Sequence, residues 1–192
     1  MSTLIILGCG KAQTPLIIKA QKMGFKIIGV DKNPDSYAAK IVDIFICAST
    51  YSFNDLNANP KFASIDKIDG MLIKSSGIPI LTSSKIAKKF KIPLIPPESV
   101  EKCIYKDLLK FFCESHGILS PQSVTLKELP TQDFLLSRGI EFPQVLRPAI
   151  SIKGKSGVYF IKNFNELKIY FDESLKLSLN RKVILDKYID GI

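Results

Sequence analysis

Residues 3–13 read TLIILGCGKAQ, a short apolar run that leads into a turn with two glycines. The run Thr3–Leu7 predicts a buried strand, and Gly8 and Gly10 predict a tight turn. Apolar residues then recur at helical spacing until Gly24, which predicts a helix that this glycine ends. A strand, a glycine turn and a helix in this order form the first unit of a parallel α/β sheet.

The same alternation continues along the first half of the chain. Further apolar runs predict strands, and two segments between them predict helices, the second of which begins at Pro79. Strands that alternate with helices predict a parallel, doubly wound, Rossmann-like sheet. The predicted strands after the first are Phe25–Val30, Ile41–Cys47, Gly70–Ile73 and Ile92–Ile95, and the other helix is expected from about Asn54 and Asp55.

The pattern changes after Pro96 and Pro97. Two short helices come next, and three strands are then expected, two of which flank a polar loop. Because the strand–helix alternation stops, this half is expected to be α+β. We therefore predict two domains, residues 1–97 and residues 98–192. The expected elements of the second are strands at residues 144–146, 158–161 and 183–188, and a helix that begins at Asn163 with Glu166 in a capping box.

Composition narrows the classes of partner. The chain of 192 residues is 46% hydrophobic and has a net charge of +9, which favours an anionic partner. Its lysines are spread along the whole chain, and no segment interleaves basic and aromatic residues, so nucleic acid is not expected. No apolar run approaches the roughly 18 residues that cross a bilayer, so no membrane is expected either. A phosphorylated small molecule remains as a candidate partner. The alternative is that this protein is generally basic and has no particular anionic partner.

Cysteine usage bears on metal binding and on the compartment. The four cysteines form no CxxC pair, and His116 is the only histidine. A zinc site is therefore not expected, whereas reduced thiols are. The first residues also lack the basic prelude and cleavage site of a signal peptide, so we expect a cytoplasmic protein.

The turn from Gly8 to Gln13 is the first candidate site. A glycine turn before a helix lets the backbone approach a phosphate. Asp31 follows Gly10 by 21 residues, where an acid would bind a ribose hydroxyl in a dinucleotide site. Gln13 stands where that fingerprint has its third glycine, so we predict that NAD and NADP do not bind. An NAD-dependent oxidoreductase and a turn without a ligand remain as alternatives.

Residues 146–158, LRPAISIKGKSGV, form the second candidate site. Arg147 ends a predicted strand, and a small basic loop with two glycines leads into the next strand. Its amides and lysines are suited to neutralise phosphates. The spacing of a Walker loop is absent, and an ordinary hairpin connection is the alternative.

Residues 183–191, VILDKYIDG, form the third candidate site. Alternation and β-branched residues predict a strand on which Asp186 is a lone acid. An exposed edge strand with charged residues is the alternative.

In this order, these stretches resemble the ATP-grasp superfamily, in the group that includes biotin carboxylase, carbamoyl phosphate synthase and the purine-biosynthesis ligases. Residues 1–97 resemble the pre-ATP-grasp domain, above all from Ile68 to Pro97. Residues 98–119 resemble the start of the ATP clamp. Residues 144–158 resemble its phosphate loop, and residues 183–191 resemble the hinge strand that holds adenine. The likeness covers nearly the whole chain, and it implies a Rossmann-like domain followed by the first lobe of an ATP-grasp domain.

The resemblance implies ATP and Mg²⁺ as cofactors. Lys106 and Arg147 would hold the phosphates, and Asp186 would hold adenine together with the backbone of Lys187 and Ile189. The loop over the phosphates would comprise Lys153, Gly154, Lys155, Ser156 and Gly157. The residues of the first domain that would face the acceptor substrate are Gly8, Gly10, Gln13, Ser75 and Ser76.

Two residues depart from the family's pattern. Arg147 stands in place of a lysine, which replaces a point charge by a planar fork of donors. Asp186 stands in place of a glutamate, so its carboxylate reaches one methylene less far. A nucleotide-binding module without catalysis is therefore kept as the alternative.

The family's reaction is the phosphorylation of a carboxylate by ATP, followed by attack of a nucleophile on the acyl phosphate. The resemblance thus implies a ligase with a small-molecule carboxylate and an acceptor nucleophile as partners, while catalytic residues stay unassigned and a homodimer stays open. In the family, the acids that hold Mg²⁺ follow the hinge strand, so they are expected beyond Ile192. Residues 1–192 are accordingly expected to be an N-terminal fragment without turnover of its own.

Overall fold

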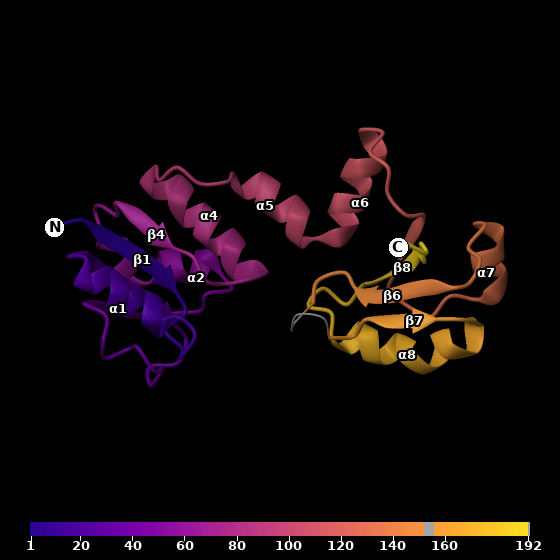
Figure 1. The fold of residues 1–192 in the computed structure, drawn as a ribbon, viewed down its shortest axis with the longest axis horizontal. Coiled ribbons are helices and arrows are strands. Elements are labelled where there is room, and N and C mark those ends of the chain that lie inside the picture. Colours follow the sequence, from indigo (N-terminus) through magenta and orange to yellow (C-terminus); the bar gives the residue numbers. More distant parts are fainter. Residues whose placement is uncertain (152–155, 192) are drawn as a thin grey trace. The chain divides into compact units, whose positions relative to one another are not determined.

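A computed structural model describes residues 1–151 and 156–191 (Figure 1). The chain divides into two compact units, Met1–Val100 and Glu101–Ile192. Helix α5, Pro97–Ile104, contains the position at which the sequence passes from one unit to the other. In the part of the chain that the structure describes, no helix combines the length and the apolar character that a membrane crossing requires.

The first unit is built on a sheet of four parallel strands in the order β3-β2-β1-β4. The glycine turn thus follows an inner strand of the sheet, as predicted for residues 3–13. The strands are β1 (Thr3–Leu7), β2 (Lys26–Asp31), β3 (Ile44–Cys47) and β4 (Gly70–Leu72).

Helices cover both faces of this sheet. Successive side chains of β1 point to opposite faces: Ile5 and Leu7 join one core, and Ile6 joins the other. The first core is completed by helices α2, α3 and α4, and the second by α1. These helices are α1 (Thr14–Lys22), α2 (Phe53–Ala58), α3 (Pro60–Ala63) and α4 (Ile78–Phe90). The predicted doubly wound arrangement is confirmed.

The predicted strand at Ile92–Ile95 is wrong. This segment turns back along α4: the Ile92 N–H donates to the Ala87 carbonyl at 2.8 Å, and the Ile95 carbonyl accepts from the Ser84 hydroxyl. Pro93 has no N–H to donate to a sheet. The apolar side chain of Ile92 packs against the first core, so the segment is apolar because it lines a helix.

Gly29 of β2 is required by close packing. A Cβ at this position would lie 2.6 Å from Cys9 Sγ and 2.9 Å from Val42 Cγ1, and both side chains are buried. We expect Gly29→Ala to lower the free energy of unfolding by about 1–3 kcal/mol, because such a core cannot expand without strain. Chemical denaturation measures this. Gly191→Ala is the control, since a Cβ there meets no described atom within 4 Å; equal stability of the two variants would contradict the packing.

The second unit is built on an antiparallel sheet of four strands in the order β5-β8-β6-β7. The alternative that residues 183–187 form an edge strand is therefore wrong, because β8 has a partner on each side. The sequence did not predict β5 or α7. The strands are β5 (Ser123–Leu126), β6 (Gln144–Pro148), β7 (Tyr159–Ile161) and β8 (Val183–Lys187), and the helices after α5 are α6 (Lys106–Ser115), α7 (Gln132–Ser137) and α8 (Phe164–Lys176).

Helix α8 begins where its capping residues predict. The Asn163 side chain accepts a hydrogen bond from the Glu166 N–H at 3.0 Å. The Glu166 carboxylate accepts in turn from the Lys162 N–H at 2.8 Å, which is one residue before the donor of an ideal capping box. The first bond satisfies an amide that the first helical turn leaves open, and the second ties the residue before the cap to that turn.

Helix α8 covers one face of the second sheet (Figure 1). The core on this face includes Leu146, Leu167, Phe171 and Leu185. Because side chains alternate along a strand, the neighbours of Leu146 and Leu185 point to the other face. Those neighbours are Arg147 on β6 and Asp186 on β8, so packing of α8 fixes where the charged side chains lie.

Candidate functional site

The face of the second sheet opposite α8 carries an ion pair between adjacent strands. Ile184 lies opposite Arg147, and Val145 lies opposite Asp186, so the two charged residues are diagonal neighbours. Arg147 Nε donates to Asp186 Oδ2 at 2.5 Å. The Asp186 side chain is 11% exposed and that of Arg147 is 37% exposed. The acid is thus buried, and the guanidinium reaches solvent.

Lys106, the first residue of α6, approaches the end of β6. Its ammonium donates to the carbonyls of Pro148 and Ala149, each at 3.2 Å. Partial burial lowers the pKa of Lys106, and the charge of Arg147 lowers it further, while Asp186 and Asp107 act in the opposite direction. Lys106 is therefore a half-buried cation that lacks full compensation, which is a favourable setting for an anion.

A second ion pair borders the first. Lys182 Nζ, just before β8, lies 3.0 Å from Asp107 Oδ2 at the start of α6. Neither residue was predicted from the sequence to belong to the site. Asp107 directly follows Lys106, and Lys182 directly precedes the predicted strand, but only the fold shows that the two side chains meet. We define the charge cluster as Lys106, Asp107, Arg147, Lys182 and Asp186.

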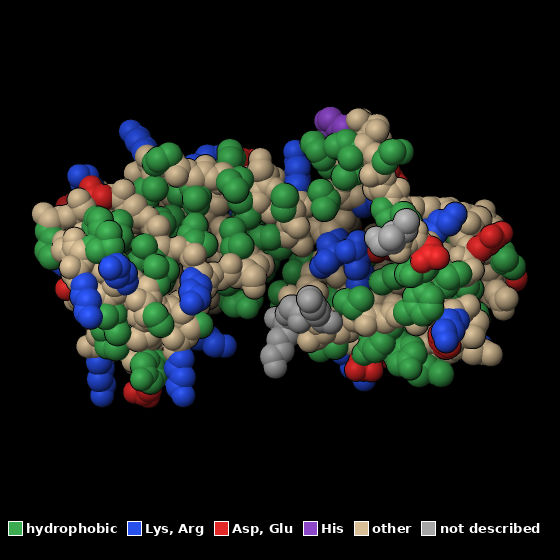
Figure 2. Space-filling model, viewed as in Figure 1, with side chains coloured by type: hydrophobic (Ala, Val, Ile, Leu, Met, Phe, Trp, Pro, Cys, Tyr) green, Lys and Arg blue, Asp and Glu red, His purple; other side chains and the backbone are tan. Residues whose placement is uncertain are grey.

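The charge cluster has three cations and two acids, so it keeps a surplus of positive charge. Lysine and arginine side chains gather over the second unit near the carboxyl end of β6 (Figure 2). Ammonium and guanidinium groups that converge in this way favour a phosphate, whose oxygens accept several charge-assisted hydrogen bonds.

The predicted phosphate loop between β6 and β7, here called the glycine loop, ends at Gly157 beside this cluster. Gly157 has a φ of 75°, and a Cβ there would lie 3.0 Å from Pro148 Cγ. Its carbonyl accepts from the buried Ser174 hydroxyl at 2.8 Å, which ties the loop to α8. Ser156 precedes it and is half-buried. The other predicted loop residues, Lys153, Gly154 and Lys155, lie outside the described residues.

The predicted adenine contacts after Asp186 differ from each other. The Lys187 N–H donates to the Gln122 carbonyl at 2.8 Å, so this amide is used within the protein. Ile189 lies past the end of β8 and is exposed. The Lys187 N–H, one of the two backbone groups predicted to contact adenine, thus already donates to a carbonyl of the protein.

The glycine turn of the first unit is held by a hydrogen bond to Asp31, at the end of β2. The carboxylate of Asp31 accepts from the Cys9 N–H at 2.8 Å and from the Asn33 N–H at 2.9 Å. Burial, with a contribution from Asp31, raises the pKa of the Cys9 thiol to about 12, so Cys9 stays protonated. Asp31 therefore braces the turn, with one backbone amide bound at each carboxylate oxygen.

The Gln13 side chain lies over this turn. Its Cδ and Oε1 lie 3.3 Å from the positions that a Cβ would take on Gly8 and Gly10. Gln13 Nε2 donates to the Lys74 carbonyl at 2.9 Å, and the Ser75 hydroxyl donates to the Leu7 carbonyl at 3.2 Å. The structure thus brings Gln13 and Ser75 together at the carboxyl ends of β1 and β4. Ser76, by contrast, is exposed beside them.

We expect NAD and NADP not to bind to this turn. A dinucleotide pyrophosphate would need the space above the two glycines that Gln13 fills. Titration of each dinucleotide, followed by the near-ultraviolet fluorescence of the reduced forms, should show no saturation up to about 1 mM. Saturable binding in the micromolar range would revive the oxidoreductase alternative.

Comparison with known proteins adds relatives of both units. No family model matches the chain. The carbamoyl phosphate synthase large chain of Vibrio parahaemolyticus is 25% identical over 130 residues, which is 67% of this chain and 12% of the relative. The formate-dependent phosphoribosylglycinamide formyltransferase of Methanocella arvoryzae is 24% identical over 188 residues, which is 97% of this chain and 43% of the relative.

Solved structures share the fold along the whole chain. The N5-carboxyaminoimidazole synthetase of Staphylococcus aureus, solved with ADP, aligns with a TM-score of 0.67 at 20% sequence identity. The alignment covers 98% of this chain and 48% of that one, so this chain spans less than half the length of that synthetase. The chain therefore has the fold of the N-terminal part of an ATP-grasp ligase, and its sequence is related to members of that superfamily.

Proposed function

We propose that the second unit binds ATP and that the chain forms the N-terminal part of an ATP-dependent carboxylate ligase. The charge cluster is the observation that carries this proposal. Lys106, Arg147 and Lys182 come from three separate segments and reach one face of the sheet beside the end of the glycine loop. The relationship to carbamoyl phosphate synthase and the fold shared with an ADP-bound synthetase support a nucleotide as the ligand.

ATP binding would exchange the partners within the cluster. A triphosphate would accept hydrogen bonds from Lys106 and Arg147, which in the structure are held by carbonyls and by Asp186. Asp186 would then be free to accept from the amino group of adenine. Because burial lowers the pKa of Lys106, a bound phosphate would raise it again by favouring the charged form.

The proposed reaction has two steps. A carboxylate oxygen of the substrate attacks the γ-phosphorus of ATP, and the bond from that phosphorus to the bridging oxygen breaks, which releases ADP and leaves an acyl phosphate. An amine then attacks the acyl carbon, phosphate leaves with the C–O bond electrons, and the amine loses a proton to solvent. Positioning and neutralisation of charge supply most of the catalysis of phosphoryl transfer, and the cations of the cluster are suited to both.

A ligase also needs a place for the acceptor substrate and for Mg²⁺. We propose that the edge formed by Gly8, Gly10, Gln13, Ser75 and Ser76 faces the acceptor substrate. Mg²⁺ would accompany ATP and supply positive charge against its phosphates. In the described parts of the chain, no three or more His, Cys, Asp or Glu side chains gather in one place. The resemblance implies that the acids that hold Mg²⁺ follow the hinge strand, and we propose that turnover requires them.

A non-catalytic nucleotide-binding module is the second candidate. The departures at Arg147 and Asp186 favour it, because an arginine stands in place of the family's lysine and an aspartate in place of its glutamate. The two candidates separate in a protein that carries both this chain and the remainder of the ligase fold. A ligase consumes ATP there when given a carboxylate and an amine, whereas a module binds ATP and does not consume it.

Calorimetric titration of ATP against residues 1–192 tests the site itself. We expect a dissociation constant on the order of 1 mM, which corresponds to about 4 kcal/mol, and no hydrolysis. Lys106→Ala should weaken binding by about tenfold, because it removes one charge-assisted hydrogen bond. Lys127→Ala removes an exposed lysine of the same unit and is the matched control. Equal losses in the two variants would refute the assignment of Lys106.

A further inference from the structure

The outward face of α1 carries an apolar strip between lysines, which its packing does not explain. Ile17 and Ala20 face the core, so they account for the position of the helix. Pro15 and Ile18 lie on the other side, and Ile18 is 38% exposed. A helix that already buries one face does not need a second apolar strip for its stability.

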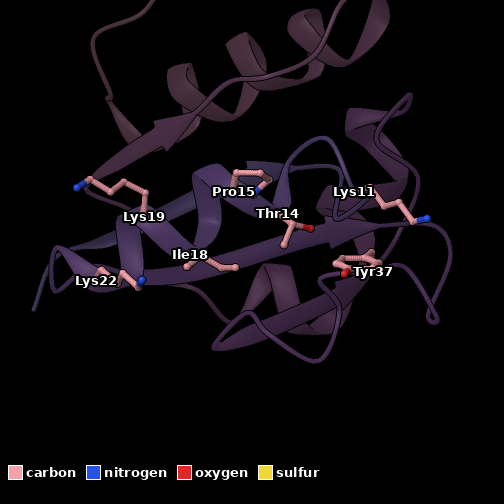
Figure 3. Close-up of a pocket in the computed structure, with 7 residues that line it drawn as sticks. All are labelled: Lys11, Thr14, Pro15, Ile18, Lys19, Lys22 and Tyr37. Carbon is pink, nitrogen blue, oxygen red and sulfur yellow. The ribbon is translucent and has the colours of Figure 1, made fainter.

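This strip forms the floor of an open groove of about 630 Å³, within the usual size range of small-molecule sites. Figure 3 shows Lys19 and Lys22 at one end of the groove, and Lys11 with Tyr37 at the other. Its lining residues are Lys11, Thr14, Pro15, Ile18, Lys19, Lys22 and Tyr37, which include three cations and no acid. In the space-filling view, lysine and arginine side chains surround apolar surface over this part of the first unit (Figure 2).

The aromatic end of the groove is held in place by the backbone. The Ala38 N–H donates to the Cys9 carbonyl at 2.7 Å, and Ala38 itself is fully buried. This bond anchors the segment that bears Tyr37, and Tyr37 itself is 61% exposed. Lys11 Nζ lies over the Tyr37 ring, 5.9 Å from its centre. An exposed aromatic ring on a braced backbone segment, with a cation nearby, has the features of a stacking platform.

We propose that this groove binds a nucleotide, with its base on Tyr37 and its phosphate on Lys19 and Lys22. Along α1, Lys22 at the phosphate end lies seven residue steps from Pro15 in the floor, about 10 Å at the rise of an α-helix. The sugar of a nucleotide separates base and phosphate and would lie over Pro15 and Ile18. This inference does not rest on the proposed function, because it concerns the other unit.

Amide shift mapping of the ¹⁵N-labelled chain tests the proposal with two matched probes, cytidine monophosphate and ribose 5-phosphate. Cytidine monophosphate should shift the amides of residues 11–14, 16–22 and 37 in a saturable way, since Pro15 has no N–H. Ribose 5-phosphate, which lacks the base, should bind at least about fivefold more weakly, because it cannot stack. Tyr37→Leu should remove most of that difference between the two phosphates.

The phosphate end is tested by charge. Lys19→Gln/Lys22→Gln should weaken the binding of cytidine monophosphate and of ribose 5-phosphate by about threefold to tenfold, the range expected for two exposed ionic contacts. Lys61→Gln/Lys85→Gln makes the same change in charge at two exposed lysines outside the groove and should leave binding unchanged. Three results would each overturn the proposal. They are equal losses of affinity in the two double variants, equal affinity of the wild type for the two phosphates, and no saturable shifts in the groove. Since these shifts lie in the first unit, failure here leaves the ATP site of the second unit untouched.

Discussion

Arg147→Gln is expected to weaken ATP binding by about tenfold to a hundredfold, the value of a charge-assisted hydrogen bond to a phosphate. The loss should exceed that of Lys106→Ala for a second reason. Without Arg147, the buried carboxylate of Asp186 loses its partner at 2.5 Å, and its charge then repels the incoming phosphates. Calorimetric titration of ATP against the variant measures the effect.

The double variant Arg147→Gln/Asp186→Asn separates the two contributions. Removing the acid with the cation abolishes the repulsion, so the double variant should bind ATP more tightly than Arg147→Gln alone. The single variant Asp186→Asn completes the cycle. If Arg147→Gln and the double variant bind ATP equally, the ion pair does not influence the nucleotide. If Arg147→Gln binds as tightly as the wild type, Arg147 does not contact ATP.

Phe171→Ala is expected to lower the free energy of unfolding by about 3–5 kcal/mol, the cost of removing a buried aromatic ring and leaving a cavity. The Phe171 side chain is 1% exposed and lies between α8 and the sheet. Its loss should loosen the face that sets the direction of Arg147 and Asp186, so ATP binding should weaken as well. Denaturant unfolding measures the first effect and titration the second.

Phe111→Ala is the matched control in the same unit. Phe111 lies on α6 and is 69% exposed, so its truncation should change stability by less than about 0.5 kcal/mol. A Phe171→Ala variant that is as stable as Phe111→Ala would show that the core does not have the described packing.

The first unit could be predicted closely because its signals are local. The run Thr3–Leu7 matches β1 in both bounds, since a buried parallel strand reads as a continuous apolar run. The one wrong strand, at Ile92–Ile95, shows the limit of this signal. A segment that packs along a helix is as apolar as a buried strand, and only the hydrogen bonds to Ala87 and Ser84 distinguish the two.

The second unit was predicted less completely because its sheet is antiparallel, and its strands do not read as continuous apolar runs. β5, Ser123–Leu126, has four residues, two of them polar, so its sequence does not stand out. Without β5, the sequence could not place β8 inside the sheet, and the edge-strand alternative stayed open. Pairing on both sides, with Ser123 and with Val145, is what buries Asp186.

Residues of the candidate site were identified by resemblance, whereas their mutual contacts were not. Lys106, Arg147 and Asp186 are far apart in the sequence, and the fold brings them to one face. Asp107 and Lys182 were missed because a single charged residue beside a predicted element carries no distinctive pattern. The structure also adds a reason for the prediction that no dinucleotide binds: the Gln13 side chain covers the glycines, which the missing third glycine alone could not show.

We propose that ATP binds at the charge cluster of the second unit. Amide shift mapping of the ¹⁵N-labelled chain during titration with ATP tests this most directly, because it locates the ligand without requiring turnover. We expect saturable shifts at Lys106, Arg147, Ser156, Gly157 and Asp186, and Arg147→Gln should move their midpoint to higher ATP concentration. Saturable shifts confined to the first unit, with these five amides unchanged, would contradict the proposal.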